Sequence, residues 1–102
     1  MLRVKKRYLL VRIFPQQVEV KPEELREAVA EELSRIGGWS ALAEAGISVK
    51  RYRHEGGEFL IRCSLRSLSI VLLSLTLIKG IRGKKVRLDV TKIGGTIRGL
   101  RE

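Results

Sequence analysis

The feature that most constrains this chain is the stretch LRSLSIVLLSLTLI at residues 65–78, in which nine of fourteen residues are apolar. At about 100° per residue, this pattern predicts a helix with two apolar stripes, whereas an ordinary surface helix has one. The first stripe would pack on the chain's own sheet, so another surface must cover the second. The first stripe consists of Leu65, Leu68, Val71, Leu72, Leu75 and Ile78. The second stripe consists of Ile70, Leu73 and Leu77.

The second stripe admits two interpretations. It is a contact surface for a partner protein, which is our first hypothesis, or it is core that a neighbouring helix or the C-terminal tail covers. A membrane span fits less well, because the run is shorter than the roughly 20 residues that a bilayer requires. Four Ser or Thr residues also interrupt it. We therefore predict partner-binding residues and no membrane association.

Alternating apolar residues and turn residues predict the order strand, helix, strand, strand, helix, strand. The ranges are 3–14, 22–36, 47–54, 58–64, 65–78 and 84–93, with a short extra turn of helix at 39–45. This order predicts an α+β, ferredoxin-like βαββαβ two-layer sandwich, with a four-stranded antiparallel sheet and two main helices on one face. A length of 102 residues predicts a single domain over 1–102.

Side-chain alternation then predicts a basic sheet face opposite the helices. If Phe59, Ile61 and Cys63 point at the helices, Leu60 and Arg62 point the other way. The same alternation places on that opposite face Tyr8, Arg12, Lys50, Tyr52, Lys85, Arg87, Asp89 and Thr91.

Charge is the strongest signal in the composition. The chain has 21 Lys and Arg against 11 Asp and Glu, a net charge of +10. Segment 22–36 holds five Glu and two Arg, or −3, so the other residues carry 19 basic and 6 acidic side chains, or +13. This separation predicts a polyanionic partner. An aromatic content of 5% argues against a single-strand binder, so structured RNA or DNA fits better.

Basic residues form three clusters near the predicted strands: Arg3, Lys5, Lys6 and Arg7; Lys50, Arg51 and Arg53; and Arg82, Lys84, Lys85 and Arg87. The candidate RNA-binding residues come from these clusters, from two further strand positions and from the tail. They are Arg3, Lys5, Lys6, Arg7, Arg12, Lys50, Arg51, Arg53, Arg62, Lys84, Lys85, Arg87 and Arg98.

No set of catalytic residues stands out. Asp89 is the only Asp and His54 the only His, and we interpret His54 as a solvated turn residue beside Glu55. Cys63 lies on the predicted buried face, which favours a core residue over a nucleophile, and no zinc-binding spacing exists. Acylphosphatases share this size and fold class but rely on an asparagine, which this chain lacks.

A lone cysteine forms no disulfide within the chain, and we predict a cytoplasmic protein.

The tail contains the segment IGGTIRG at residues 93–99. Gly94 and Gly95 allow positive φ and close backbone approach, and the alternative is that they merely end a strand. Thr96 is placed to cap a following turn. Arg98 is a candidate ligand for a phosphate or a partner carboxylate.

At these residues the chain resembles the archaeal ribonuclease P protein component 2 family, which is related to a subunit of eukaryotic ribonuclease P and of the mitochondrial-RNA-processing ribonuclease. The likeness rests on KKRYLL at 5–10, FLIRC at 59–63 and VTKIGGTIRGL at 90–100, in family order over nearly the whole chain. The resemblance implies an accessory subunit of an endoribonuclease whose catalyst is an RNA. That RNA uses magnesium to remove the 5′ leader of precursor tRNA, and the protein itself binds no cofactor.

The resemblance also implies partners: the ribonuclease P RNA, precursor tRNA and protein component 3, with self-association left open. Two alternatives remain. One is another small protein that binds structured RNA, such as a ribosomal protein. The other is a regulatory domain that binds a small ligand.

Overall fold

The computed structural model describes residues 5–52 and 57–100. The main elements follow the predicted order: strand, helix, strand, strand, helix, strand. Two short strands are added between the second long helix and the last strand, and a short helix is added after that strand. The elements are β1 (Lys6–Phe14), α1 (Pro22–Ala45), β2 (Ser48–Arg51), β3 (Glu58–Ser64), η1 (Leu65–Ser67), α2 (Leu68–Leu77), β4 (Gly80–Ile81), β5 (Lys84–Lys85), β6 (Arg87–Gly94) and α3 (Ile97–Leu100).

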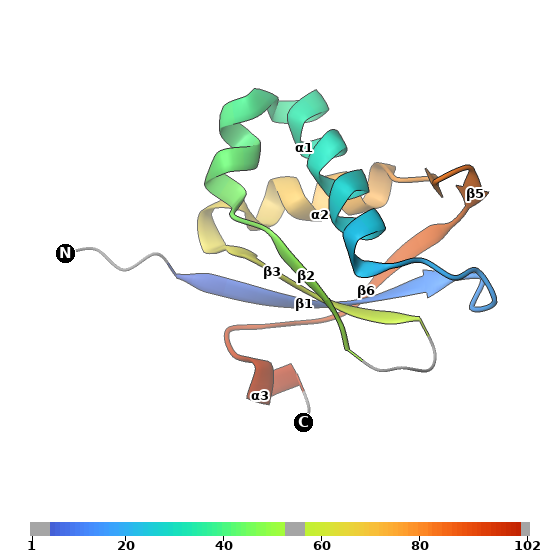
Figure 1. Cartoon of the computed structure of the whole chain (residues 1–102). Helices are drawn as coiled ribbons and strands as arrows, with labels where there is room; N and C mark the ends of the chain where they lie inside the picture. The colour runs from blue at the N-terminus through green and yellow to red at the C-terminus, as the bar shows by residue number, and fades with distance from the viewer. Residues whose placement is uncertain (1–4, 53–56, 101–102) are drawn as a thin grey trace.

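The main sheet has the strand order β2-β3-β1-β6, and each neighbouring pair is antiparallel. Helices α1 and α2 both lie on one face of this sheet, while α3 lies on the other (Figure 1). Two helices over one face and this strand order confirm the predicted ferredoxin-like α+β sandwich.

The core forms where the sheet meets α1 and α2. Strand β3 alternates as predicted: Phe59, Ile61 and Cys63 are buried, whereas Arg62 is exposed. Burial of an apolar side chain of this size stabilises the fold by about 1.5–3 kcal/mol. Apolar residues of both helices close the core from above: Leu25, Val29, Leu33, Val71 and Leu75.

Glycine breaks α1 where the sequence predicts an end. Gly38 has φ 78° and ψ −178°, which kinks the element, and residues 39–45 form a second helical segment. Gly46 then ends this segment in the left-handed region (φ 54°, ψ 47°), which glycine adopts at little cost. At the other end, the backbone N–H of Lys21 donates to Oε1 of Glu24 at 2.9 Å.

The long apolar helix differs in part from its prediction. Its first turn is the 3₁₀ segment η1, and Leu65, predicted to face the sheet, is 37% exposed. In the second stripe, Ile70 packs beside Gly37 of α1, where an added Cβ would lie 2.8 Å from the Ile70 Cδ1 atom. Leu73 and Leu77 stay 47% and 38% exposed. A neighbouring helix therefore covers one end of the stripe and leaves the other open.

The predicted fourth strand over 84–93 is found as β6, but it begins at Arg87, and Lys84 and Lys85 belong to β5 instead. Residues 80–85 form a separate hairpin, β4–β5, and the N–H of Val86 donates to the carbonyl of Lys79 at 3.0 Å before β6 begins. This local hairpin satisfies backbone groups that a continuous strand would present to the main sheet.

Two further predicted boundaries shift, and one short helix is added. Strand β2 ends within 47–54 at Arg51, β1 begins at Lys6, and the tail forms α3, which was not predicted as a helix. Of the predicted turn at Glu55, Gly56 and Gly57, only Gly57 is described, with φ 62°. His54 lies outside the described residues. In the described part of the chain, no helix is long and apolar enough to cross a membrane.

Candidate nucleic-acid interface

The sheet face turned away from α1 and α2, called here the open face, carries side chains in rows across the strands. Residues directly opposite one another in an antiparallel sheet project to the same side. One row joins Ser48, Arg62, Tyr8 and Gly94; a second joins Lys50, Leu60, Leu10 and Lys92; a third contains Glu58, Arg12 and Asp89; a fourth contains Phe14 and Arg87.

Two basic side chains of these rows are free to bind a ligand. Lys50 on β2 and Arg62 on β3 are exposed, and neither side chain has an ion pair or hydrogen bond within residues 5–52 and 57–100. They belong to neighbouring rows of one paired strand unit. The backbone ladder therefore fixes the relative positions of the Lys50 and Arg62 Cα atoms, and no described residue neutralises either charge.

A hollow lies in the middle of the open face, lined by Leu10, Arg12, Tyr52, Glu58, Thr91, Lys92 and Leu100. Arg12 Nη2 lies 3.6 Å from Oε1 of Glu58, whose side chain is buried. Arg12 Nε is buried and has no hydrogen-bond partner among the described residues. The Arg12 guanidinium is thus only partly satisfied by the protein.

A β-bulge explains why Lys92 lines this hollow, although alternation along β6 would place it on the other face. The pairing of β1 with β6 shifts between Leu10 and Val11, so Lys92 pairs with Leu10. Thr91, placed there by alternation, also lines the hollow and donates its hydroxyl to the carbonyl of Leu10 at 3.1 Å. Strict alternation from Val90 would turn Lys92 toward the helices. Glu58 was likewise not predicted as a site residue, although it begins the predicted third strand.

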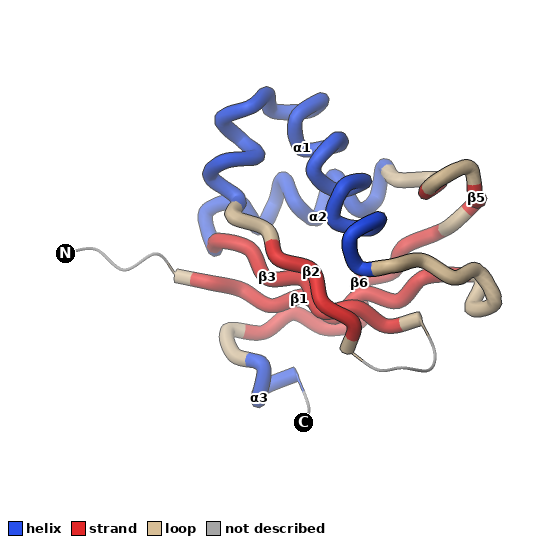
Figure 2. Tube along the Cα trace, viewed as in Figure 1, coloured by secondary structure: helices blue, strands red, loops and turns tan. Residues whose placement is uncertain are grey.

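Helix α3 folds back over one end of the open face (Figure 2). Leu100 is 2% exposed, and the ammonium of Lys92 donates to the carbonyl of Leu100 at 3.1 Å. An added Cβ on Gly94 would lie 3.3 Å from a Leu100 methyl, so the lack of a side chain at Gly94 leaves room for Leu100. Neither Gly94 nor Gly95 has positive φ, and β6 ends at Gly94. Thr96 Oγ1 accepts the N–H of Gly99 at 3.1 Å and caps the turn as predicted.

Arg51 lies on the other side of the sheet from Lys50. It pairs with Phe59, whose side chain is in the core, and its guanidinium lies 5.3 Å from the centre of the Phe59 ring. Its Nη2 also donates to the carbonyl of Val20 at 3.2 Å. The predicted cluster of Lys50, Arg51 and Arg53 is therefore divided between two faces in its described part, and Arg53 lies outside the described residues.

The predicted third cluster is split as well, because Lys84 and Lys85 stand on β5 and Arg87 on β6. Arg87 Nη2 lies 3.3 Å from Asp89 Oδ2, and its guanidinium lies 5.0 Å from the centre of the Phe14 ring. The ammonium of Lys84 donates to the carbonyl of Glu19 at 2.8 Å. Lys85 is exposed and has no side-chain partner within the described ranges.

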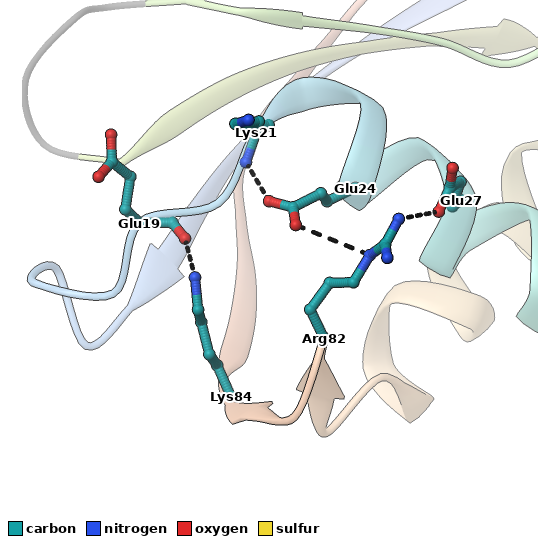
Figure 3. Close-up of polar contacts among 6 residues, drawn as sticks. All are labelled: Glu19, Lys21, Glu24, Glu27, Arg82 and Lys84. Atoms are coloured by element: carbon teal, nitrogen blue, oxygen red, sulfur yellow. Dashed lines mark hydrogen bonds and ion pairs between the residues drawn. The ribbon is translucent and has the colours of Figure 1, made fainter.

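The β4–β5 hairpin also brings Arg82 against the acidic helix α1. Arg82 lies 2.9 Å from Oε2 of Glu27 and 3.7 Å from Oε2 of Glu24 (Figure 3). The pKa of Glu24 is lowered, chiefly by the hydrogen bond from the Lys21 backbone, with smaller effects of the Lys84 and Arg82 charges. These contacts neutralise Arg82 on the helical layer. Lys50 and Arg62 on the open face have no such partner among the described residues.

The remaining predicted cations lie at the two ends of the chain. Arg7 donates to the carbonyl of Lys6 at 2.9 Å and lies beside Gly95, while Lys5 is exposed at the start of β1. Arg98 is exposed on α3. Arg3 lies outside the described residues.

Nucleophilic and metal chemistry has little support in the described residues. Burial raises the pKa of the Cys63 thiol, and the side chain is fully inside the core. Within residues 5–52 and 57–100, no three His, Cys, Asp or Glu side chains gather where they would hold a metal ion. What the open face presents instead is the exposed cations Lys50 and Arg62, beside Arg12 and its ion pair with Glu58.

Comparisons with known proteins agree with this architecture. Ribonuclease P protein component 2 of Methanoculleus marisnigri and that of Pyrococcus furiosus are each 29% identical to this chain over 100 residues, or 98% of it. The chain spans 61% of the first relative's length and 82% of the second's. A chain in the structure of yeast ribonuclease MRP has the same fold, with a TM-score of 0.67 at 12% identity, over 94% of this chain and 78% of that one.

The model of the Rpp14/Pop5 family matches residues 7–102. This match covers all four strands of the main sheet, the helices on both faces and the IGGTIRG segment. The chain belongs to the Rpp14/Pop5 family.

Proposed function

We propose that this protein is an accessory subunit of ribonuclease P, which binds structured RNA through its open face and assists removal of the 5′ leader from precursor tRNA. Its family and the names of its two archaeal relatives support this role. Hydrolysis belongs to the RNA and its magnesium in this proposal. The protein acts in the cytoplasm, where it contributes binding and electrostatic stabilisation.

The observation that carries the proposal is the pair of unpartnered cations on the open face. Lys50 and Arg62 are held by the sheet ladder, while α1, with its acidic residues, lies on the opposite face of that sheet (Figure 1). Phosphate contacts by such cations release counterions and stabilise compact RNA. They therefore lower the magnesium concentration that the RNA needs to reach its active structure.

The exposed part of the second apolar stripe is the proposed contact with protein component 3. Leu73 and Leu77 stand four residues apart on α2, so they share one side of the helix. Both are substantially exposed, whereas Ile70 of the same stripe already packs against α1. A partner helix or loop would bury the two leucines. Self-association through the same surface is the competing outcome.

The experiment is cleavage of precursor tRNA by the cognate ribonuclease P RNA at limiting magnesium, with and without this protein, alone and paired with component 3. We expect the pair to stimulate cleavage. We expect Lys50→Glu with Arg62→Glu to abolish most of the stimulation, because two anchoring charges become repulsive. Arg26→Glu, on the acidic helix α1, is the control for a charge change elsewhere.

RNA binding without any change in cleavage would refute the ribonuclease P role and favour a general protein that binds structured RNA. Absence of salt-dependent RNA binding would favour a domain that binds a small ligand.

A further inference from the structure

The outer edge of β6 is available for pairing. Strand β6 stands last in the order β2-β3-β1-β6, and no strand of the described chain pairs with its outer side. It is eight residues long. Backbone N–H and C=O groups on such an edge form a template for another strand unless the protein covers them.

An apolar groove runs beside this edge. Helix α2 and β6 line a hollow of about 670 Å³ that is open to one side. Its apolar walls include Leu72 and Leu75 from α2 and Leu88 and Val90 from β6. Leu72 and Val90 are only half-buried, so the two layers leave part of their shared apolar surface uncovered at this edge.

The rim of the groove is basic. Lys79, Lys85 and Arg87 line it, and Asp89, its one acidic lining residue, is paired with Arg87 at 3.3 Å. Lys79 and Lys85 are exposed, and their side chains have no partner within residues 5–52 and 57–100. An occupant of this groove must therefore supply both apolar side chains and negative charge.

We propose that β6 and the groove bind an extended segment of a partner protein, in which apolar and acidic residues alternate, as an additional strand. A strand added about 4.8 Å from β6 places every second side chain on the face of Leu88 and Val90, inside the groove. The intervening side chains fall on the face of Arg87. Acidic residues at those positions and at the segment's ends meet the basic rim.

The basic rim and the apolar walls of the groove favour this occupant over a second copy of the chain and over RNA. A second copy of a chain that carries +10 would bring another basic rim against this one. An RNA backbone would match the lysines but leave the leucine and valine walls uncovered, since phosphate and ribose present no apolar side chains. The inference is independent of the role proposed for the open face.

The test uses two capped, fluorescein-labelled eight-residue peptides, one alternating valine with glutamate and one alternating valine with lysine. We expect the glutamate peptide to bind the full chain and the lysine peptide to bind at least about tenfold more weakly. Lys79→Glu with Lys85→Glu should lower the affinity for the glutamate peptide about tenfold, because two attractive charge pairs become repulsive. Arg26→Glu with Arg66→Glu, the matched charge change elsewhere, should alter its affinity less than about twofold.

Amide hydrogen exchange locates the bound peptide. We expect the glutamate peptide to slow exchange in Arg87–Gly94 and to leave Ser48–Arg51, on the other outer strand, unchanged. Equal slowing on both strands, no binding up to about 1 mM, or equal affinity of the two peptides would each overturn the proposal. Loss of structured-RNA binding in the double lysine variant, with peptide binding intact, would assign the rim to nucleic acid instead.

Discussion

Replacing Lys50 and Arg62 by glutamine tests the open face most directly. Both side chains are exposed, and neither has a partner within residues 5–52 and 57–100. The substitutions therefore break no ion pair and open no cavity within the protein. Any change in RNA affinity then reports on charges that face the ligand.

The expected loss of RNA affinity follows from counterion release. Each phosphate contact contributes about 0.9 to the slope of log K against log salt, so losing two contacts flattens the slope by about 1.8. At about 0.15 M salt each contact contributes about 0.7 log units, or about 1 kcal/mol. We therefore expect the double variant to bind about 30-fold more weakly at that salt concentration.

The assay is fluorescence anisotropy with a labelled helical element of the ribonuclease P RNA, titrated at several salt concentrations between about 50 and 200 mM. The control is Arg26→Gln with Arg82→Gln, which removes the same formal charge from α1 and from the hairpin that pairs with it. Arg82 is already neutralised by Glu24 and Glu27, so we expect the control to retain the wild-type slope.

An unchanged slope in the Lys50 and Arg62 variant would refute the reasoning. So would an equal flattening in the control, because net charge alone would then explain the affinity. If both variants unfold at the same midpoint temperature as the wild type, loss of the fold is excluded as the cause of weaker RNA binding.

Three other predictions follow from the same contacts. Leu73→Glu with Leu77→Glu should leave the circular dichroism spectrum unchanged and weaken pairing with component 3 in gel filtration; outright unfolding would assign both leucines to the core. Gly94→Val should displace α3, because even a Cβ would lie 3.3 Å from a Leu100 methyl; faster amide exchange in Ile97–Leu100 checks this, and unchanged exchange contradicts it. Glu24 has a pKa below its ordinary value of 4.5, so its stabilising contribution is complete above about pH 4.5 and disappears as the pH falls through the lowered value. Urea unfolding of wild type and Glu24→Gln should therefore differ near pH 6 and converge toward pH 3; a constant difference would refute the assignment.

The long-range pattern of the fold was readable from local chemistry. Period-two alternation in residues 58–64 located β3 with its observed bounds, because each of its core side chains must reach the same apolar layer. The first helix and its break at Gly38 followed from one apolar stripe and the only residue type that adopts positive φ at low cost. Side-chain alternation along the strands also predicted the open face, with Arg62 and Lys50 on it.

Other features depended on contacts between segments far apart in the chain. Alternation could not foresee the bulge that brings Lys92 onto the open face, since a bulge is defined by the pairing of two strands. The sequence also could not show that Ile70 is covered while Leu73 and Leu77 are exposed, because only the position of α1 decides which end of the stripe is covered.

By itself, the sequence determined the order of the main elements, their buried faces and the excess of positive charge, because these depend on side-chain chemistry and spacing along one segment. The tertiary structure alone decided which cations remain free. Arg51, Arg82 and Lys84 look equivalent to Lys50 in the sequence, yet folding places them against an aromatic ring, two carboxylates and a backbone carbonyl. Whether a charge is available to a ligand depends on which groups the rest of the chain brings to it.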